Sequence, residues 1–155
     1  MDGAFAWVRQ ASDAAYRADR DVQGSNSSGQ LGLGDLHDRD TPTLVHSFPP
    51  DVVSIGGGGS YALALDSSGA VWKSGTFELD GMDVEFERLP TPWQVQRIQC
   101  GWGFAVLISG DATVHGVGRS NFTQIDCLPE TASGAAAGMH HSLFAVPDGI
   151  LGRGA

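Results

Sequence analysis

The sequence predicts an all-β repeat protein, and two observations predict it. The first is an internal copy: the segment IGGGGSYALALDSSGAVWKSG, which begins at Ile55, aligns without a gap with IQCGWGFAVLISGDATVHGVG, which begins at Ile98. The second is the order of signals in each copy, where an alternating apolar run is followed by a turn-rich cluster and a second short apolar run. Self-similarity at a fixed period is typical of repeat architectures, and this order of signals is typical of a β-hairpin. Each copy should therefore supply short antiparallel strands.

The two copies share their apolar positions and their glycines. The anchor pairs are Ile55 and Ile98, Gly58 and Gly101, Tyr61 and Phe104, Leu63 and Val106, Leu65 and Ile108, Val71 and Val114, and Gly75 and Gly118. A weaker third copy runs from Gly138 through His141 and Ser142 to Gly154. We therefore expect three hairpins of the same design.

A glycine-rich segment, GSNSSGQLGLGD, precedes the first copy. Its glycines suit a tight connection that needs positive φ or a close backbone approach, and Asn26 and Ser27 can bond their own backbone. These glycines are Gly24, Gly29, Gly32 and Gly34. The chain's 22 glycines then punctuate turns, and a hydrophobic content of 41% is that of a folded protein.

These motifs resemble the repeat of the regulator of chromosome condensation family, which reads roughly G-x-N-x-x-G-Q-L-G, then a proline and a valine, then A-G-x-x-H-S-x-A-L. The resemblance implies an incomplete β-propeller with about three of the family's seven blades. It also implies that ten residues hold the repeat together: Gly24, Asn26, Gly29, Gln30, Leu31, Gly32, Gly58, Gly101, Gly138 and His141. The sequence departs from the pattern at Tyr61 and Phe104, which replace the histidine, and at Ser74 and Val117, which replace the tryptophan before glycine.

The predicted organisation is a non-repeat extension over residues 1–23 and a partial propeller over 24–155, with units at about 24–75, 76–118 and 119–155. A propeller protects its strand edges by closing into a ring, so three blades would expose an apolar flank on each side. We therefore expect a fragment of a longer chain, which on its own would aggregate or oligomerise.

The extension has helical propensity from Ala4 to Val22. Two interpretations stay open for it, a poorly packed extension and a partner-binding helix. It has no apolar core of a secretory signal, and no segment of the chain is long and apolar enough to span a membrane. We therefore expect no membrane partner.

The chain carries a net charge of −9 with a single lysine, Lys73. Affinity for phosphate backbones comes largely from clustered lysine and arginine, so direct nucleic-acid binding is not expected. An acidic surface favours a basic or mixed protein partner. The two cysteines, Cys100 and Cys127, have no C-x-x-C spacing and are expected to be free thiols in the reducing cytoplasm or nucleus.

Two patterns imitate catalytic or cofactor sites. The run from Val52 to Tyr61 imitates a dinucleotide-binding turn, but its continuation alternates like a strand. His140, His141 and Ser142 with Asp148 imitate a hydrolase constellation, but His141 and Ser142 fall where the repeat uses such residues for packing.

The acidic groups, Asp35 to Asp40 and Glu78 to Glu87, lack calcium-loop spacing and are expected to form solvated loops; His37, His46 and His115 are isolated. No catalytic residue, cofactor or metal site is predicted, and the protein is not expected to be an enzyme.

Three aromatic residues are candidates for partner binding: Trp102, Trp93 and Phe122. Trp102 stands between Gly101 and Phe104 in a loop position where the first copy has Gly59, and a large exposed aromatic there could anchor a partner. The alternative is that Trp102 packs over the neighbouring blade. Trp72 is expected in the core.

Within the family, the order and spacing of the motifs are similar to those of small fungal members of the alpha-tubulin-suppressor type. The residues that carry this resemblance are Pro49-Pro50, the segment from Trp72 to Gly75, and Trp102. That resemblance implies a non-catalytic scaffold in tRNA wobble-uridine modification and diphthamide synthesis, with a small zinc-binding electron-carrier protein as partner. One alternative is a guanine-nucleotide exchange factor for a small GTPase. Another is a fragment without independent function.

Overall fold

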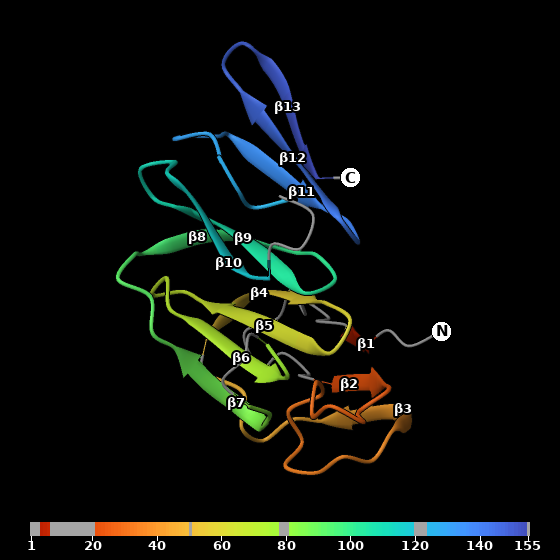
Figure 1. The fold of residues 1–155 in the computed structure, drawn as a ribbon. Helices are drawn as coiled ribbons and strands as arrows, with labels where there is room; N and C mark the ends of the chain where they lie inside the picture. The colour runs from red at the N-terminus through yellow and green to blue at the C-terminus, as the bar shows by residue number, and fades with distance from the viewer. Residues whose placement is uncertain (1–3, 7–20, 50, 78–80, 120–123, 155) are drawn as a thin grey trace.

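The computed structural model describes residues 4–6, 21–49, 51–77, 81–119 and 124–154, and in these residues the protein is all-β. Four small antiparallel sheets follow one another along the chain (Figure 1). The first holds β1 (Ala4–Ala6), β2 (Asp21–Gly24) and β3 (Arg39–Leu44). The second holds β4 (Val52–Gly57), β5 (Tyr61–Asp66), β6 (Val71–Gly75) and β7 (Asp83–Leu89). The third holds β8 (Val95–Cys100), β9 (Phe104–Ser109) and β10 (Val114–Gly118), and the fourth holds β11 (Gly134–Ala137), β12 (His141–Val146) and β13 (Gly149–Gly154).

The three predicted hairpins are confirmed, and they share one register. In each, the first residue of the hairpin's first strand pairs with the glycine that ends its second strand. The pairs are Tyr61 with Gly75, Phe104 with Gly118 and His141 with Gly154. All three glycines adopt positive φ, which explains why glycine recurs there.

The strands β5 and β9 are buried on both faces because a core cluster lies on either side of each. Along β5 the large side chains Tyr61, Leu63 and Leu65 enter a cluster shared with the third sheet. The intervening alanines, Ala62 and Ala64, enter a cluster shared with the first sheet. A strand sends successive side chains to opposite faces, so β5 presents its large residues to one cluster and its alanines to the other.

The strand β12 differs because only one of its faces is covered. Ser142 and Phe144 are buried, and Phe144 packs with Phe104 and Val106 of the third sheet. The alternate residues, His141, Leu143 and Ala145, are exposed. The fourth sheet thus leaves an open face at one end of the series of sheets (Figure 1).

Two sequence predictions are corrected by the structure. Asp83, Glu85 and Glu87 lie in the strand β7 and not in a solvated loop, because β7 pairs with β6 and buries Phe86 and Leu89. β7 falls in the predicted second unit, so the sheets are offset from the sequence repeats.

The helical expectation is wrong where the extension can be described. Ala4–Ala6 form the strand β1 and pair with β2, whose first residues are Asp21 and Val22. Pairing with the edge of β2 supplies main-chain hydrogen bonds that override a weak helical propensity. Residues 7–20 lie outside the described residues.

The glycine-rich loop is built as the sequence predicts. Gly24, Gly29, Gly32 and Gly34 all have positive φ. The fully buried Asn26 accepts the Leu31 N–H at its side-chain oxygen, 2.9 Å away, and donates from Nδ2 to the Asp35 carbonyl at 2.8 Å. Leu31 enters the core beside the second sheet.

The same loop is fastened to the second sheet through the small residue that replaces the family's tryptophan. The Ser74 hydroxyl donates to the Gln30 carbonyl across 3.0 Å, and both residues are buried. Ser74 is smaller than the family's tryptophan and instead makes a hydrogen bond that ties the loop to β6.

The described residues contain no helix long and apolar enough to cross a membrane.

Candidate functional site

A ring folded over a glycine opens each hairpin. The rings of Tyr61, Phe104 and His141 lie over the glycine three residues earlier, where an added Cβ would come within 2.4 Å of the ring in every case. The glycines are Gly58, Gly101 and Gly138, and each donates its N–H to the carbonyl of the ring residue at 2.8 to 2.9 Å. These residues therefore occupy one structural position in three successive sheets.

Tyr61 also joins two sheets. Its fully buried hydroxyl is 3.0 Å from the Gly101 carbonyl and makes a short contact with the Phe104 carbonyl. Burial raises the pKa of Tyr61 well above its ordinary value, so the hydroxyl stays a donor. Cys100 lies beside it and, for the same reason, has a thiol pKa raised to about 12.

Trp102 packs over the neighbouring sheet, which is one of the two interpretations that its sequence position left open, and the partner-anchoring role stays a prediction. Its indole lies over Gly59, where an added Cβ would come within 2.6 Å of the ring, and the Gly59 N–H donates to the Trp102 carbonyl at 2.8 Å. The side chain nevertheless remains 47% exposed. Trp102 is therefore a large aromatic residue held in place by the neighbouring sheet and still open to solvent.

Met139 occupies the matching position in the next sheet, since it follows Gly138 as Trp102 follows Gly101. It is 54% exposed. Repetition places both side chains at the same end of their sheets, before the first residue of β9 and of β12. Sequence comparison of the copies could have found Met139, but an isolated methionine gave no chemical reason to select it.

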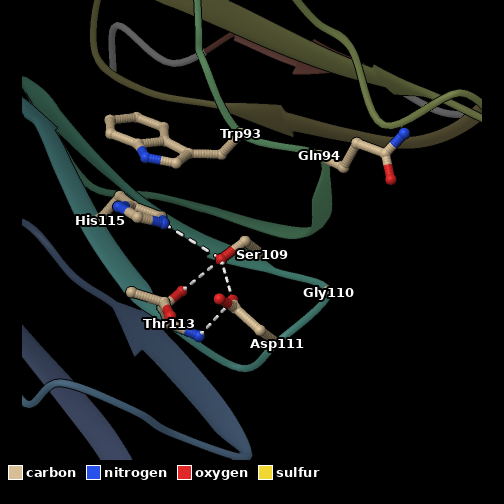
Figure 2. Close-up of a pocket in the computed structure, with 7 residues that line it drawn as sticks. All are labelled: Trp93, Gln94, Ser109, Gly110, Asp111, Thr113 and His115. Atoms are coloured by element: carbon tan, nitrogen blue, oxygen red, sulfur yellow. Dashed lines mark hydrogen bonds between the residues drawn. The ribbon is translucent and has the colours of Figure 1, made fainter.

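Trp93 lies at the other end of the third sheet, in the loop before β8. Its indole stacks on the His115 ring with the centroids 3.8 Å apart and the planes inclined by 16° (Figure 2). The two rings line an open hollow of about 520 Å³ together with Gln94, Ser109, Gly110, Asp111 and Thr113. From the sequence, His115 was expected to be an isolated histidine. In the structure it contacts Trp93, from the loop before β8, and Ser109, at the end of β9.

The Ser109 hydroxyl stands at the centre of this cluster, within hydrogen-bond distance of three groups (Figure 2). It is 2.7 Å from Asp111 Oδ1, 3.2 Å from the Thr113 carbonyl and 3.1 Å from His115 Nε2. Bonds from Ser109 and Thr113 hold the pKa of Asp111 at about 2, so its carboxylate only accepts.

The directions of these hydrogen bonds argue against a role for Ser109 as a catalytic nucleophile. The hydroxyl proton has two acceptors in Asp111 and the Thr113 carbonyl, which leaves His115 Nε2 to donate to Ser109. Burial lowers the pKa of His115 more than the Asp111 charge raises it, so the imidazole is neutral at pH 7. A catalytic histidine would instead accept the serine proton and be oriented by the carboxylate.

The first hairpin has the same network with serine and aspartate exchanged. There Asp66 takes the place of Ser109, Ser68 that of Asp111 and Trp72 that of His115. The Asp66 carboxylate accepts from Ser68 Oγ at 2.6 Å and from Trp72 Nε1 at 2.9 Å, and Asp66 is only 8% exposed. The exchange moves the charge from the inside of the turn to its exposed outside, where Asp111 stands.

The other sequence candidates separate in space or fall outside the description. His141 begins β12, whereas Asp148 lies in the turn after it, and the buried Ser142 hydroxyl contacts the Gln124 carbonyl. The run before Tyr61 passes from β4 into β5 with no helix, as predicted. Phe122 lies outside the described residues. Within the described ranges no three histidine, cysteine or acidic side chains gather as metal ligands do, and Cys100 and Cys127 are free thiols.

Residues 23–65 match the sequence profile of the family described as regulator of chromosome condensation (RCC1) repeat. The fold of the described residues is similar to that of Prp20p from Saccharomyces cerevisiae, with a TM-score of 0.71 and 22% identity over 86% of this chain and 40% of that one. It is also similar to human WBSCR16, with a TM-score of 0.70 and 19% identity over 88% of this chain and 43% of that one. The four sheets therefore match part of an RCC1-type β-propeller.

Two curated relatives have recognisable sequence similarity. The secretion-regulating guanine nucleotide exchange factor of Bos taurus is 27% identical over 83% of this chain and 33% of its own length. The protein RCC2 homolog of Xenopus laevis is 27% identical over 66% of this chain and 22% of its own. The chain thus spans a third or less of the curated relatives that it matches here.

Proposed function

We propose that this chain is a non-catalytic protein-binding module whose contact surface includes Trp102 and Met139. The observation that carries the proposal is the exposure of a tryptophan whose ring is already fixed over Gly59. A prearranged aromatic loses little conformational freedom on binding, and tryptophan is enriched among residues that dominate interface energies. Met139, which is 54% exposed, offers a second apolar side chain at the same end of the next sheet.

A small GTPase is the partner class that we propose first. The relative that covers 83% of this chain is named a guanine nucleotide exchange factor, although the chain spans 33% of it. Nucleotide exchange by this chain is the alternative to binding alone, and it is tested separately. The narrower prediction of a role in tRNA modification and diphthamide synthesis, through a zinc-binding electron carrier, receives no support from these relatives and stays a prediction.

The test measures binding of the full chain to a panel of purified small GTPases, each in nucleotide-free and nucleotide-bound forms, by biolayer interferometry. Trp102→Ala should weaken binding at least about tenfold, as truncation of an interface tryptophan does. Ile150→Ala is the matched control, because Ile150 is 79% exposed and lies in β13, away from this end of the third sheet.

Release of a fluorescent nucleotide, measured separately, reports exchange. Binding without accelerated nucleotide release would support the binding module and refute the exchange activity. Equal affinity of wild type and Trp102→Ala for every GTPase that binds would refute the proposed surface, and the absence of any binding would refute the partner class.

A further inference from the structure

The hollow beside Trp93 lies far from the Trp102 surface. Trp102 precedes β9 and Asp111 follows it, so the six residues of β9 separate them. At about 3.3 Å per residue this is a distance of about 17 Å or more along the strand. Whatever binds one site therefore need not touch the other.

The lining combines an aromatic ring, a neutral imidazole and an exposed carboxylate, with no lysine or arginine among its residues. Trp93 has one face against His115 (Figure 2), is only partly buried, and lines the hollow. Asp111 lies at the rim, exposed to solvent. Such a lining repels anions and offers a cation both a counter-charge and an aromatic surface.

We propose that this hollow binds an arginine side chain from a basic segment of a protein partner, with the guanidinium on the exposed part of Trp93 and paired with Asp111. A guanidinium is planar and weakly hydrated, so it stacks on an aromatic ring and pairs with a carboxylate at the same time. An ammonium group is compact and strongly hydrated, so lysine should bind less well. The chain's net charge of −9 would also attract a basic segment from a distance.

The first hairpin shows that the exposed carboxylate is not required to build the turn. The same serine–aspartate hydrogen bond exists there with the partners exchanged, 2.6 Å from Ser68 to Asp66 against 2.7 Å from Ser109 to Asp111. The Asp66 carboxylate accepts four hydrogen bonds from donors of its own hairpin. The third sheet therefore differs from the second in presenting its charge outward beside a ring stack, and this difference is the basis of the inference.

The experiment titrates the ¹⁵N-labelled full chain with N-acetyl-arginine amide and follows the Trp93 indole N–H and the Gly110 and Asp111 amides by NMR. N-acetyl-citrulline amide has nearly the same shape without the charge, and N-acetyl-lysine amide has the charge without the planar group. Arginine should bind at least roughly tenfold more tightly than either. Equal affinity for citrulline or for lysine would overturn the proposal.

Two variants remove the carboxylate from the rim without removing the turn. The double exchange Ser109→Asp with Asp111→Ser copies the first hairpin and keeps the net charge, and Asp111→Asn keeps an acceptor oxygen for Ser109 and Thr113. Both should lose most arginine binding. Asp148→Asn, in the corresponding turn of the fourth sheet, removes the same charge elsewhere and should bind as wild type does.

Retained arginine affinity in a folded Asp111→Asn variant would refute the role of Asp111. Trp102→Ala is measured in parallel and should leave the arginine titration unchanged. Because the GTPase panel and the arginine titration use different ends of β9, failure of the proposed function and failure of this inference give different results.

Discussion

Removal of the Tyr61 hydroxyl tests how the second and third sheets are held together. Tyr61→Phe keeps the ring over Gly58 and its contact with Phe77, whose centroid is 4.4 Å away, and deletes only the oxygen. Phenylalanine is sterically suitable, because Phe104 occupies the equivalent position over Gly101. The variant therefore isolates what one buried hydroxyl contributes between the two sheets.

The expected loss is about 1–3 kcal/mol of unfolding free energy. A neutral hydrogen bond contributes roughly 0.5–1.5 kcal/mol net, and a buried carbonyl left without its donor costs roughly 1–3 kcal/mol. The Phe104 carbonyl keeps the Gly101 N–H, 2.8 Å away, so the main loss falls on the Gly101 carbonyl. For a chain of this size each kcal/mol lowers Tm by about 2–4 °C.

Urea unfolding at pH 7, followed by circular dichroism, measures the difference. Tyr61→Leu is the comparison for ring packing and should lose more, about 3 kcal/mol or above, since it also empties the space over Gly58. A Tyr61→Phe midpoint equal to that of wild type would show that the hydroxyl does not hold the sheets together.

The pH dependence supplies a second readout with a defined sign. Burial raises the folded-state pKa of Tyr61 above the ordinary value of about 10. Folding therefore favours the protonated hydroxyl, so its contribution is complete below pH 10 and is lost as the pH rises further. The stability gap between wild type and Tyr61→Phe should narrow above pH 10, and a gap that widens there would contradict the assignment.

Two further predictions concern the repeated glycine position and the first turn. Gly58→Ala should cost about 1–3 kcal/mol, because the new Cβ would lie 2.0 Å from the Tyr61 ring, whereas Gly134→Ala, whose nearest neighbour would be 3.9 Å away, should be close to neutral in the same urea assay. Asp66→Asn should cost about 1–2 kcal/mol at pH 7 by turning an amide N–H toward the Trp72 indole N–H, as measured by thermal unfolding. Burial opposes ionisation of Asp66, yet its hydrogen bonds hold its pKa below the usual range, so this cost should shrink as the pH falls through that pKa; a cost independent of pH would point to packing alone.

The repeat made most of the fold predictable. Aligning Tyr61 with Phe104 and Gly75 with Gly118 predicted hairpins of one design, since a copied pattern implies a copied backbone. β7 could not be found in this way, because its acidic residues dominate its composition and only Phe86 and Leu89 mark its buried side. No sequence pattern indicates that β7 pairs with β6.

The candidate sites were predictable to a smaller extent. Trp102 was selected from the sequence because the first copy has glycine at that position. The structure then showed that its side chain is 47% exposed. The pairing of Trp93 with His115 joins a loop to the third strand of a sheet, a contact that no local pattern carries. The exchange of serine and aspartate between the two turns was visible in the alignment, but its meaning depends on which of the two positions is buried.

The three ring positions also make the joints between sheets unequal. Where the second and third sheets meet, Tyr61 reaches across with a hydroxyl, whereas where the third and fourth sheets meet the corresponding ring, Phe104, contributes apolar packing alone. Main-chain bonds join the third sheet to the segment before β11, from the Val114 N–H to the Glu130 carbonyl at 3.1 Å and from the Ala132 N–H to the Ala112 carbonyl at 3.0 Å. At the ring position, one joint therefore has a side-chain hydroxyl that a substitution can remove, whereas these bonds at the other joint belong to the backbone. Trp102 lies on the joint of the second and third sheets, through its contact with Gly59, so a load applied to Trp102 would pass to both of these sheets together.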